Sequence, residues 1–378
     1  MNTMTRALLA LLLILGQFPV AAAPRRRAVR SPEPVVVPAA IVTAAREAAD
    51  AALKGGIPAV QIAVSERGRI IYAESFGVAD QQSETAATPR SVMQIGSVTK
   101  QFTAAAILRL AERGALTLDE RIEKYVPELN NRGATITLRQ LLSHTSGVRR
   151  DWYPTTPSGL APPAPVTREH TIKTLNEQPF DFPPGTKWSY SNAGYLLLGY
   201  AIESITGRSY PDFIHTEFAL PLGLVDTGVC GTQNLPLPEG YGLLGGSWVR
   251  MPAPHTSVLL SAGTLCSTAS DLARWAHLLA TGHVMLPASY ATMTTAARLP
   301  NGTIVTSGYA LGVATQNMLG HPAVWHSGAI DGFQSFLVHF SNQDIAVAVI
   351  TNAFPTGPAG GNPQSIATAV AKAALPAP

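Results

Sequence analysis

The chain has 378 residues, of which 46% are hydrophobic and 13% are charged, and its formal net charge is +3. This composition supplies ample material for a hydrophobic core and excludes a disordered chain, and the length favours two lobes or one large elaborated domain. The one dense basic run, Arg25-Arg26-Arg27 with Arg30, has no aromatic residue interleaved, so nucleic acid is not an expected partner.

The first residues have the pattern of a secretory signal. Arg6 precedes the unbroken apolar run ALLALLLILG, and small residues follow up to Ala22. This apolar run is shorter than a typical membrane-spanning helix. We therefore predict a signal peptide over residues 1–22, a Pro/Arg-rich linker over 23–40, and an exported protein, periplasmic or secreted, with no transmembrane span in the mature chain.

Cys230 and Cys266 are the two cysteines of the chain, and their spacing is not that of a metal site. In an oxidising compartment the pair could form a disulfide. Two buried free thiols are the alternative, because a sequence does not show whether the two Cα atoms approach each other.

Periodicity and capping signals predict helices in the middle of the chain and strands toward both ends. Thr137 and Gln140 are spaced for a capping box, and Gly114 and Gly207 are placed to end helices. The expected helices cover residues 41–54, 97–113, 137–143, 192–206, 267–281 and 364–374. The expected strands form a hairpin over 58–77, with its turn at Arg67-Gly68, and cover 323–328, 333–340 and 345–352.

The connections between the last strands are so short that neighbouring strands must be antiparallel. The economical fold is α/β (α+β): an antiparallel sheet built from both chain ends and flanked by helices, with a mostly helical lobe inserted. We predict one domain over 41–378, with a sheet lobe over about 41–84 and 301–378 and a helical lobe over about 85–300.

Ser97 and Lys100 carry the strongest chemical signal. A lysine three residues after a serine at the start of a helix lies on the same helix face and can reach the hydroxyl. Burial or a neighbouring cation would lower the pKa of the lysine and make it a base. The competing interpretation is that Ser97 caps the helix and Lys100 is solvated.

Two further motifs complete the candidate site. Tyr190-Ser191-Asn192 precedes a long apolar helix. A tyrosine can transfer protons, and the amide of an asparagine can hold a carbonyl group. Asn192 could also be an ordinary helix cap. His326-Ser327-Gly328 ends a short strand, where the glycine allows close approach of a ligand. A histidine at a strand end can equally be structural.

The three motifs, in this order, resemble those of the serine β-lactamase and penicillin-binding protein superfamily, in particular its branch of class C β-lactamases, D,D-peptidases and esterases. The stretches LLSHTSG (141–147) and STASDLARW (267–275) are also similar to recurrent segments of that branch. The resemblance runs from about residue 41 to the terminal helix and implies the β-lactamase/transpeptidase-like fold.

The resemblance also implies a role for each matching position. Ser97 would be the acylated nucleophile, with Lys100 and Tyr190 sharing proton transfer and Asn192 positioning the substrate. The third motif, His326-Ser327-Gly328, would line the substrate site, and the backbone N–H groups of Ser97 and Ala329 would form the oxyanion hole.

One motif departs from the typical class C pattern, and one histidine is left without a role. In typical class C β-lactamases the third motif is Lys-Thr-Gly. Histidine in place of that lysine removes a permanent positive charge that would bind a substrate carboxylate. This departure argues against efficient β-lactam hydrolysis without excluding a β-lactam substrate. His144 is interpreted as a residue that closes a short helix before Gly147, with no chemistry assigned.

Other enzyme classes lack their signatures in this sequence. No serine stands in a Gly-x-Ser-x-Gly elbow, and no His-Glu-x-x-His cluster suggests zinc, so neither a cofactor nor a metal is expected. We predict an exported serine hydrolase that cleaves an amide, ester or β-lactam carbonyl of a small molecule or peptide, with contact to peptidoglycan as one possibility. A non-catalytic cell-wall sensor with the same fold is the alternative.

The sequence leaves the substrate pocket and the oligomeric state open. The proline-rich loops 153–165 and 233–254 are candidates for the walls of the cleft. Trp152, Tyr153 and Trp248 either line an apolar pocket or pack between structural elements.

Overall fold

The structure is a computed structural model that describes residues 37–153, 162–232, 235–305, 308–354 and 361–377. The predicted signal peptide (1–22), most of the predicted linker and part of the 153–165 loop lie outside these residues. Helix α1 (Ala39–Lys54) begins two residues before the expected start at 41, because Pro38 suits the position before a helix and the alanines that follow are strong helix formers. No described helix is both long and apolar enough to cross a membrane.

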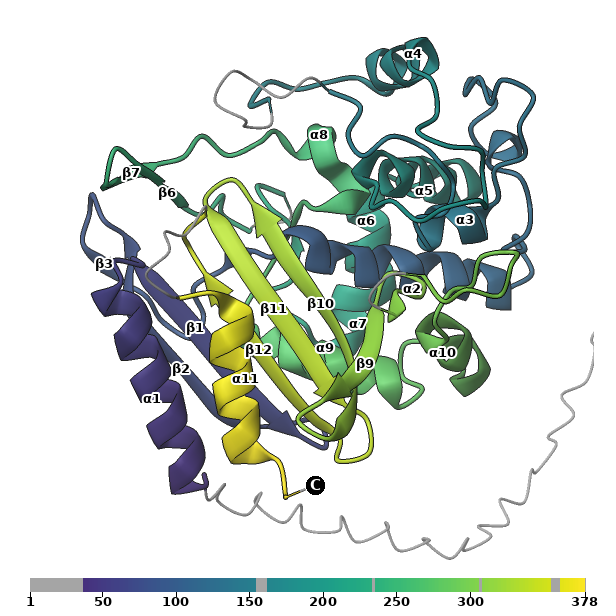
Figure 1. Cartoon of the computed structure of the whole chain (residues 1–378). Helices are drawn as coiled ribbons and strands as arrows, with labels where there is room; N and C mark the ends of the chain where they lie inside the picture. Colours follow the sequence, from purple (N-terminus) through teal and green to yellow (C-terminus); the bar gives the residue numbers. More distant parts are fainter. Residues whose placement is uncertain (1–36, 154–161, 233–234, 306–307, 355–360, 378) are drawn as a thin grey trace, which may run out of the picture. The chain divides into compact units, whose positions relative to one another are not determined.

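Strands from both ends of the chain form one antiparallel sheet, as predicted (Figure 1). The N-terminal hairpin turns at Arg67-Gly68, and its first strand pairs with the last strand of the chain, so that Ile62 lies opposite Val349. Among the described residues the sheet has seven strands, in the spatial order β3 (Thr85–Ala86), β2 (Arg69–Asp80), β1 (Ala59–Glu66), β12 (Ile345–Thr351), β11 (Phe333–Phe340), β10 (His321–Ile330) and β9 (Ala314–Met318).

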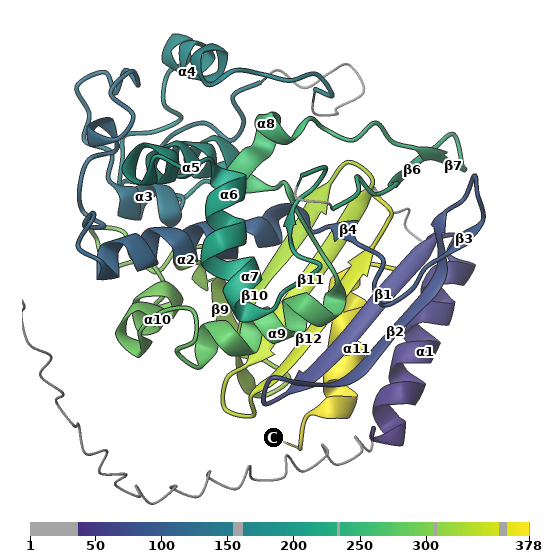
Figure 2. The same ribbon diagram turned by 180° about the vertical axis from the view of Figure 1, so that it is seen from behind.

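Helices cover both faces of this sheet. α1 and α11 (Pro363–Ala374) pack on one face, and α9 (Ala269–Ala280) packs on the other, as Figures 1 and 2 show from opposite sides. The buried residues of α1 recur every three or four positions, which gives one apolar stripe toward the sheet. Every residue of β12 is buried because both of its faces are covered.

The other helices follow β4 and build the helical part of the chain. As predicted, Thr137 and Gln140 form a capping box, and Gly207, with φ of +66°, ends the long apolar helix α5. These helices are α2 (Thr99–Glu112), α3 (Leu138–Leu142), α4 (Arg168–Glu177), α5 (Asn192–Thr206), α6 (Tyr210–Ile214), α7 (Leu220–Leu222), α8 (Thr256–Leu259) and α10 (Pro287–Thr294). Strand β3 and helix α9, which lie within 85–300, belong to the seven-stranded sheet and to the layer that covers it.

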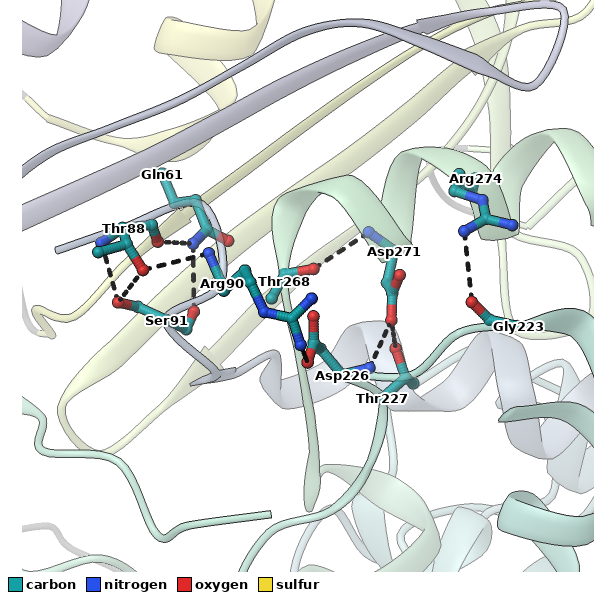
Figure 3. Close-up of polar contacts among 10 residues, drawn as sticks. All are labelled: Gln61, Thr88, Arg90, Ser91, Gly223, Asp226, Thr227, Thr268, Asp271 and Arg274. Atoms are coloured by element: carbon teal, nitrogen blue, oxygen red, sulfur yellow. Dashed lines mark hydrogen bonds and ion pairs between the residues drawn. The ribbon is translucent and has the colours of Figure 1, made fainter. Parts of the chain in front are cut away.

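The N-terminus of α9 is fixed by buried polar contacts (Figure 3). Thr268 caps the helix by accepting a hydrogen bond from the Asp271 N–H at 3.2 Å. The Asp271 carboxylate in turn accepts from the Asp226 N–H and the Thr227 hydroxyl, at 2.9 and 3.0 Å. The segment before Cys230 is thereby attached to the helix that supports the sheet.

A small second sheet places the candidate nucleophile. β8 (Leu265–Ser267) lies between β4 (Met93–Gln94) and β5 (Gly228–Val229). Cys230 and Cys266 form a disulfide across it, with their Cα atoms 5.2 Å apart, which resolves the alternative that the sequence left open. A separate hairpin, β6 (Tyr241–Leu244) and β7 (Ser247–Arg250), completes the strands of the described residues.

Candidate active site

Ser97 lies in a single 3-10 turn, η1 (Gly96–Val98), between β4 and α2. Gly96 permits this turn because its φ is +50°, a conformation that other residues rarely adopt. Lys100 follows in the first turn of α2 and is fully buried, with 0% of its surface exposed. The interpretation of Lys100 as a solvated charge is therefore wrong.

The Lys100 amine has three oxygen neighbours. Its Nζ lies 2.7 Å from the Ala262 carbonyl oxygen, 2.8 Å from Asn192 Oδ1 and 3.2 Å from Ser97 Oγ. The carbonyl and amide oxygens can only accept hydrogen bonds, whereas the serine hydroxyl can also donate. A neutral amine has two hydrogens for the two acceptors, and its lone pair is then left for the Ser97 hydroxyl.

The surroundings of Lys100 favour this neutral form. Burial lowers the pKa of Lys100 well below its ordinary value, the Asp151 carboxylate opposes this shift, and the Arg150 guanidinium adds to it. An amine so desolvated is suited to take a proton from the adjacent serine.

Asn192 contacts the Lys100 amine and is not the helix cap. The neighbouring Ser191 caps α5, since its Oγ accepts from the Gly194 N–H at 2.8 Å. The Asn192 amide is therefore free to accept from Lys100 and to donate from Nδ2 to Asp151 Oδ1 at 2.7 Å. Asp151 is a site residue that the sequence did not indicate, because a single acidic residue in a loop has no distinguishing pattern.

Tyr190 lies over the same amine. The Lys100 Nζ is 4.7 Å from the centre of the tyrosine ring, and the Arg150 guanidinium is 5.5 Å from it on the exposed side. Burial raises the pKa of Tyr190, and the nearby Ser97 hydroxyl lowers it. The two hydroxyls do not form a hydrogen bond of good geometry, and among the described residues the buried Tyr190 hydroxyl has no partner.

Strand β10 passes directly beside η1. A Cβ atom added at Gly328 would collide with the Ile95 carbonyl oxygen, and one at Gly96 would lie 2.8 Å from the Ala329 nitrogen. The backbone of Ala329 is thus brought next to the Ser97 turn, as an oxyanion hole formed by Ser97 and Ala329 N–H groups requires. Ser327 and Ala329 are exposed, while His326 and Gly328 are buried.

The His326 side chain faces inward. Its Nδ1 lies 2.6 Å from the Ser327 carbonyl oxygen and its Nε2 lies 3.0 Å from the Tyr309 hydroxyl. Burial and the Lys100 amine lower the pKa of His326 to about 3. The third motif therefore presents a neutral histidine with both nitrogens already bonded, and its exposed hydroxyl belongs to Ser327.

His144 lies beside the candidate site, which goes beyond its predicted role of closing a helix. It does follow α3 with φ of +60°, as a closing residue would. Its ring, however, is 4.3 Å from the Tyr190 ring and bonds to the Ser191 N–H and the Tyr309 hydroxyl. Tyr309 was likewise missed, because nothing in its local sequence indicates a contact with residues so distant in the chain.

The aromatic residues considered as walls of the cleft are Trp152, Tyr153 and Trp248. Trp152 is buried in the main core and donates its indole N–H to the Val258 carbonyl. Trp248 packs beside Gly56, at the end of α1. Both are packing residues, and Tyr153 is half-buried against the main core. Among the described residues, no group of His, Cys, Asp and Glu has the arrangement of a metal site.

The chain is similar in sequence to known proteins. The chain is 28% identical over 320 residues to "Protein flp" of Staphylococcus aureus (strain N315), an alignment that covers 79% of this chain and 60% of that protein. The chain thus spans about 60% of the length of this relative.

Solved structures share the fold. The octameric penicillin-binding protein homologue from Pyrococcus abyssi superposes with a TM-score of 0.74 at 27% identity, covering 87% of this chain and 76% of that one. The D-amino acid amidase from Ochrobactrum anthropi SV3 complexed with D-phenylalanine superposes with a TM-score of 0.77 at 22% identity, covering 88% and 99%. The Beta-lactamase family model matches residues 39–371, nearly the whole described chain, and the protein belongs to this family.

Proposed function

We propose that this protein is a serine hydrolase that cleaves an ester, amide or β-lactam carbonyl through an acyl-enzyme on Ser97. The observation that carries the proposal is the buried Lys100 amine, whose two other neighbours are acceptor-only oxygens, so that its lone pair is left for the Ser97 hydroxyl. Membership of the Beta-lactamase family supports it.

In the first half-reaction, Ser97 Oγ attacks the carbonyl carbon while its proton passes to the Lys100 amine. The carbonyl oxygen becomes an oxyanion held by the N–H groups of Ser97 and Ala329. The bond to the leaving group then breaks. Tyr190, kept protonated by its raised pKa, donates its proton to the leaving group and regains one from the Lys100 ammonium.

Water completes the cycle. It attacks the acyl carbon, and its proton passes through Tyr190 to the neutral Lys100 amine. The bond to Ser97 Oγ breaks, Oγ takes the proton back, and a carboxylic acid leaves. Every group of the enzyme then returns to its starting protonation state.

We propose further that the site prefers an acyl donor without a free carboxylate. His326 is neutral, and both of its nitrogens are engaged. Arg150 lies near Tyr190, but its Nε is 3.5 Å from an Asp151 carboxylate oxygen. The negative charge of Asp151 therefore offsets the positive charge of Arg150. Esters and amides, including D-amino-acid peptides with a blocked carboxyl end, fit this distribution better than penicillins do.

Export is part of the proposal. The signal-like residues 1–22 support a periplasmic or secreted location, and so does the Cys230–Cys266 disulfide, since such bonds persist in oxidising compartments.

The test compares an uncharged ester, p-nitrophenyl butyrate, with benzylpenicillin, which carries a carboxylate. We expect ester turnover that Ser97→Ala abolishes, and a benzylpenicillin adduct in the intact mass that forms more slowly. Ester turnover that survives Ser97→Ala would contradict the assignment of the nucleophile. Faster acylation by benzylpenicillin would contradict the preference, and no reaction with either would favour the non-catalytic sensor.

A further inference from the structure

Three buried side chains beneath the candidate site form a continuous hydrogen-bonded chain. The Tyr309 hydroxyl lies 3.1 Å from His144 Nε2 and 3.0 Å from His326 Nε2. Backbone groups hold both ends: the Ser191 N–H lies 3.1 Å from His144 Nδ1, and the Ser327 carbonyl oxygen lies 2.6 Å from His326 Nδ1.

The two backbone groups determine where every proton lies. The Ser191 N–H can only donate, so His144 Nδ1 accepts and the neutral ring carries its hydrogen on Nε2, which donates to Tyr309. The Ser327 carbonyl can only accept, so His326 carries its hydrogen on Nδ1. His326 Nε2 is then an acceptor for the Tyr309 hydroxyl. All four hydrogen bonds run in one direction.

Because the three side chains are buried, each of them needs its hydrogen-bond partners. His144, Tyr309 and His326 are 1%, 5% and 4% exposed, so water cannot readily replace a missing partner. A buried polar group that loses its partner keeps its full desolvation cost. The Tyr195 hydroxyl donates to the Leu142 carbonyl and is also a near neighbour of the Tyr309 hydroxyl, so it offers that hydroxyl a second acceptor besides His326 Nε2.

The chain connects two motifs that are far apart in the sequence. Ser191 directly follows Tyr190, and His144 also packs against the Tyr190 ring at 4.3 Å. At the other end, Ser327 lies two residues before Ala329, on the strand that passes the Ser97 turn.

We propose that His144 and Tyr309 are positioning residues, which hold the proton donor Tyr190 and the oxyanion-hole strand β10 in register through this hydrogen-bonded chain. The inference rests on the proposed acyl-transfer function of the site. Neither residue touches the reacting atoms, so both act through Tyr190 and His326.

The kinetic test uses Tyr309→Phe, which removes one hydroxyl, and His144→Asn, which keeps an acceptor for Ser191 but cannot reach Tyr309. Tyr72→Phe is the matched control, because the Tyr72 hydroxyl donates to Glu74, in strand β2 away from the site. Misplaced reacting groups cost about 10- to 100-fold in rate, so we expect kcat for p-nitrophenyl butyrate to fall by that factor with KM little changed.

The second readout is the nitrogen-15 NMR signature of the two imidazoles. We expect opposite tautomers, with the hydrogen on Nε2 in His144 and on Nδ1 in His326. The His144→Asn variant identifies which signals belong to His144. The same tautomer in both rings would overturn the chain even if the Tyr309→Phe protein failed to fold.

The outcomes separate the inference from the function on which it rests. An active wild type whose Tyr309→Phe variant matches Tyr72→Phe in kcat would overturn the positioning role and leave the hydrolase function standing. A wild type that neither hydrolyses the ester nor acylates Ser97 would overturn the function, and the tautomer pattern alone would then decide whether the chain of hydrogen bonds exists.

Discussion

The Lys100 amine lies 3.2 Å from Ser97 Oγ, and its two other neighbours, Asn192 Oδ1 and the Ala262 carbonyl, are oxygens that only accept hydrogen bonds. This geometry suits a neutral lysine with a lone pair toward the serine. Burial lowers the pKa of Lys100 and stabilises the same form. The proposed chemistry therefore depends on a desolvated amine, and it predicts how activity responds to charge, pH and backbone changes.

Removing the Lys100 amine should slow acylation strongly. We expect Lys100→Met to lower the rate of Ser97 acylation by about 10²- to 10⁴-fold, the usual contribution of a positioned general base. Lys124→Ala is the control, since Lys124 is exposed and pairs with Glu120. Stopped-flow measurement of the acylation burst checks this, and a Lys100→Met protein that acylates at the wild-type rate would exclude lysine as the base.

The pH profile should have an acid limb set by Lys100. Activity requires the neutral amine, so kcat/KM rises with pH through the lowered pKa of Lys100. His326, with a pKa of about 3, is neutral throughout this range and contributes no limb near neutrality. A limb that Lys100→Met retains would assign the titration to another group.

Two neighbouring charges should shift that limb in opposite directions. The Asp151 carboxylate raises the pKa of Lys100 and the Arg150 guanidinium lowers it. Asp151→Asn therefore moves the acid limb of kcat/KM to lower pH, and Arg150→Gln moves it to higher pH. Arg149→Gln is the control, because Arg149 pairs with Asp181. Shifts of the same sign in both variants would contradict the assignment of the limb to Lys100.

Close approach of β10 to the nucleophile turn should make Gly96 intolerant of a side chain. Gly96 and Gly114 both have positive φ, +50° and +71°, so alanine at either position should cost about 1–2 kcal/mol of folding free energy. A Cβ at Gly96 also meets the Ala329 backbone, whereas one at Gly114 meets nothing within 4 Å. We expect a larger fall in Tm for Gly96→Ala than for Gly114→Ala, and loss of kcat in Gly96→Ala alone. Equal kcat would contradict an oxyanion hole at this contact.

The disulfide should contribute to stability and not to chemistry. It closes a separation of 36 residues, for which chain entropy predicts a contribution of about 4 kcal/mol. Reduction should lower Tm and leave the ester kcat unchanged below the transition. The Cys230→Ser/Cys266→Ser double variant should already have the lower Tm and not respond to reductant. A wild-type Tm that reductant leaves unchanged would contradict this.

The sequence predicted the parts of the site that depend on local pattern. The spacing of Ser97 and Lys100, the Thr137 capping box and the glycine after α5 are all set within a few residues, and the structure contains each of them. The antiparallel sheet followed from short connections, which admit no crossover. Local chemistry and chain geometry were sufficient for these features.

The residues that the sequence missed act through contacts across the chain. Asp151 is 41 residues from Asn192, and His144 is 165 residues from Tyr309. A single loop aspartate or tyrosine has no spacing that distinguishes it from an ordinary surface or core residue. His144 was identified as a helix-closing residue, but its ring contacts depend on how α3, α5 and β10 pack together.

The role of Ser97 as the nucleophile is tested most directly by the intact mass of the purified protein after reaction with a fluorophosphonate, for wild type and Ser97→Ala. We expect one adduct on the wild-type protein, located by peptide mapping to Ser97, and none on the variant. An adduct that persists in Ser97→Ala, or that maps to another residue in the wild type, would contradict it.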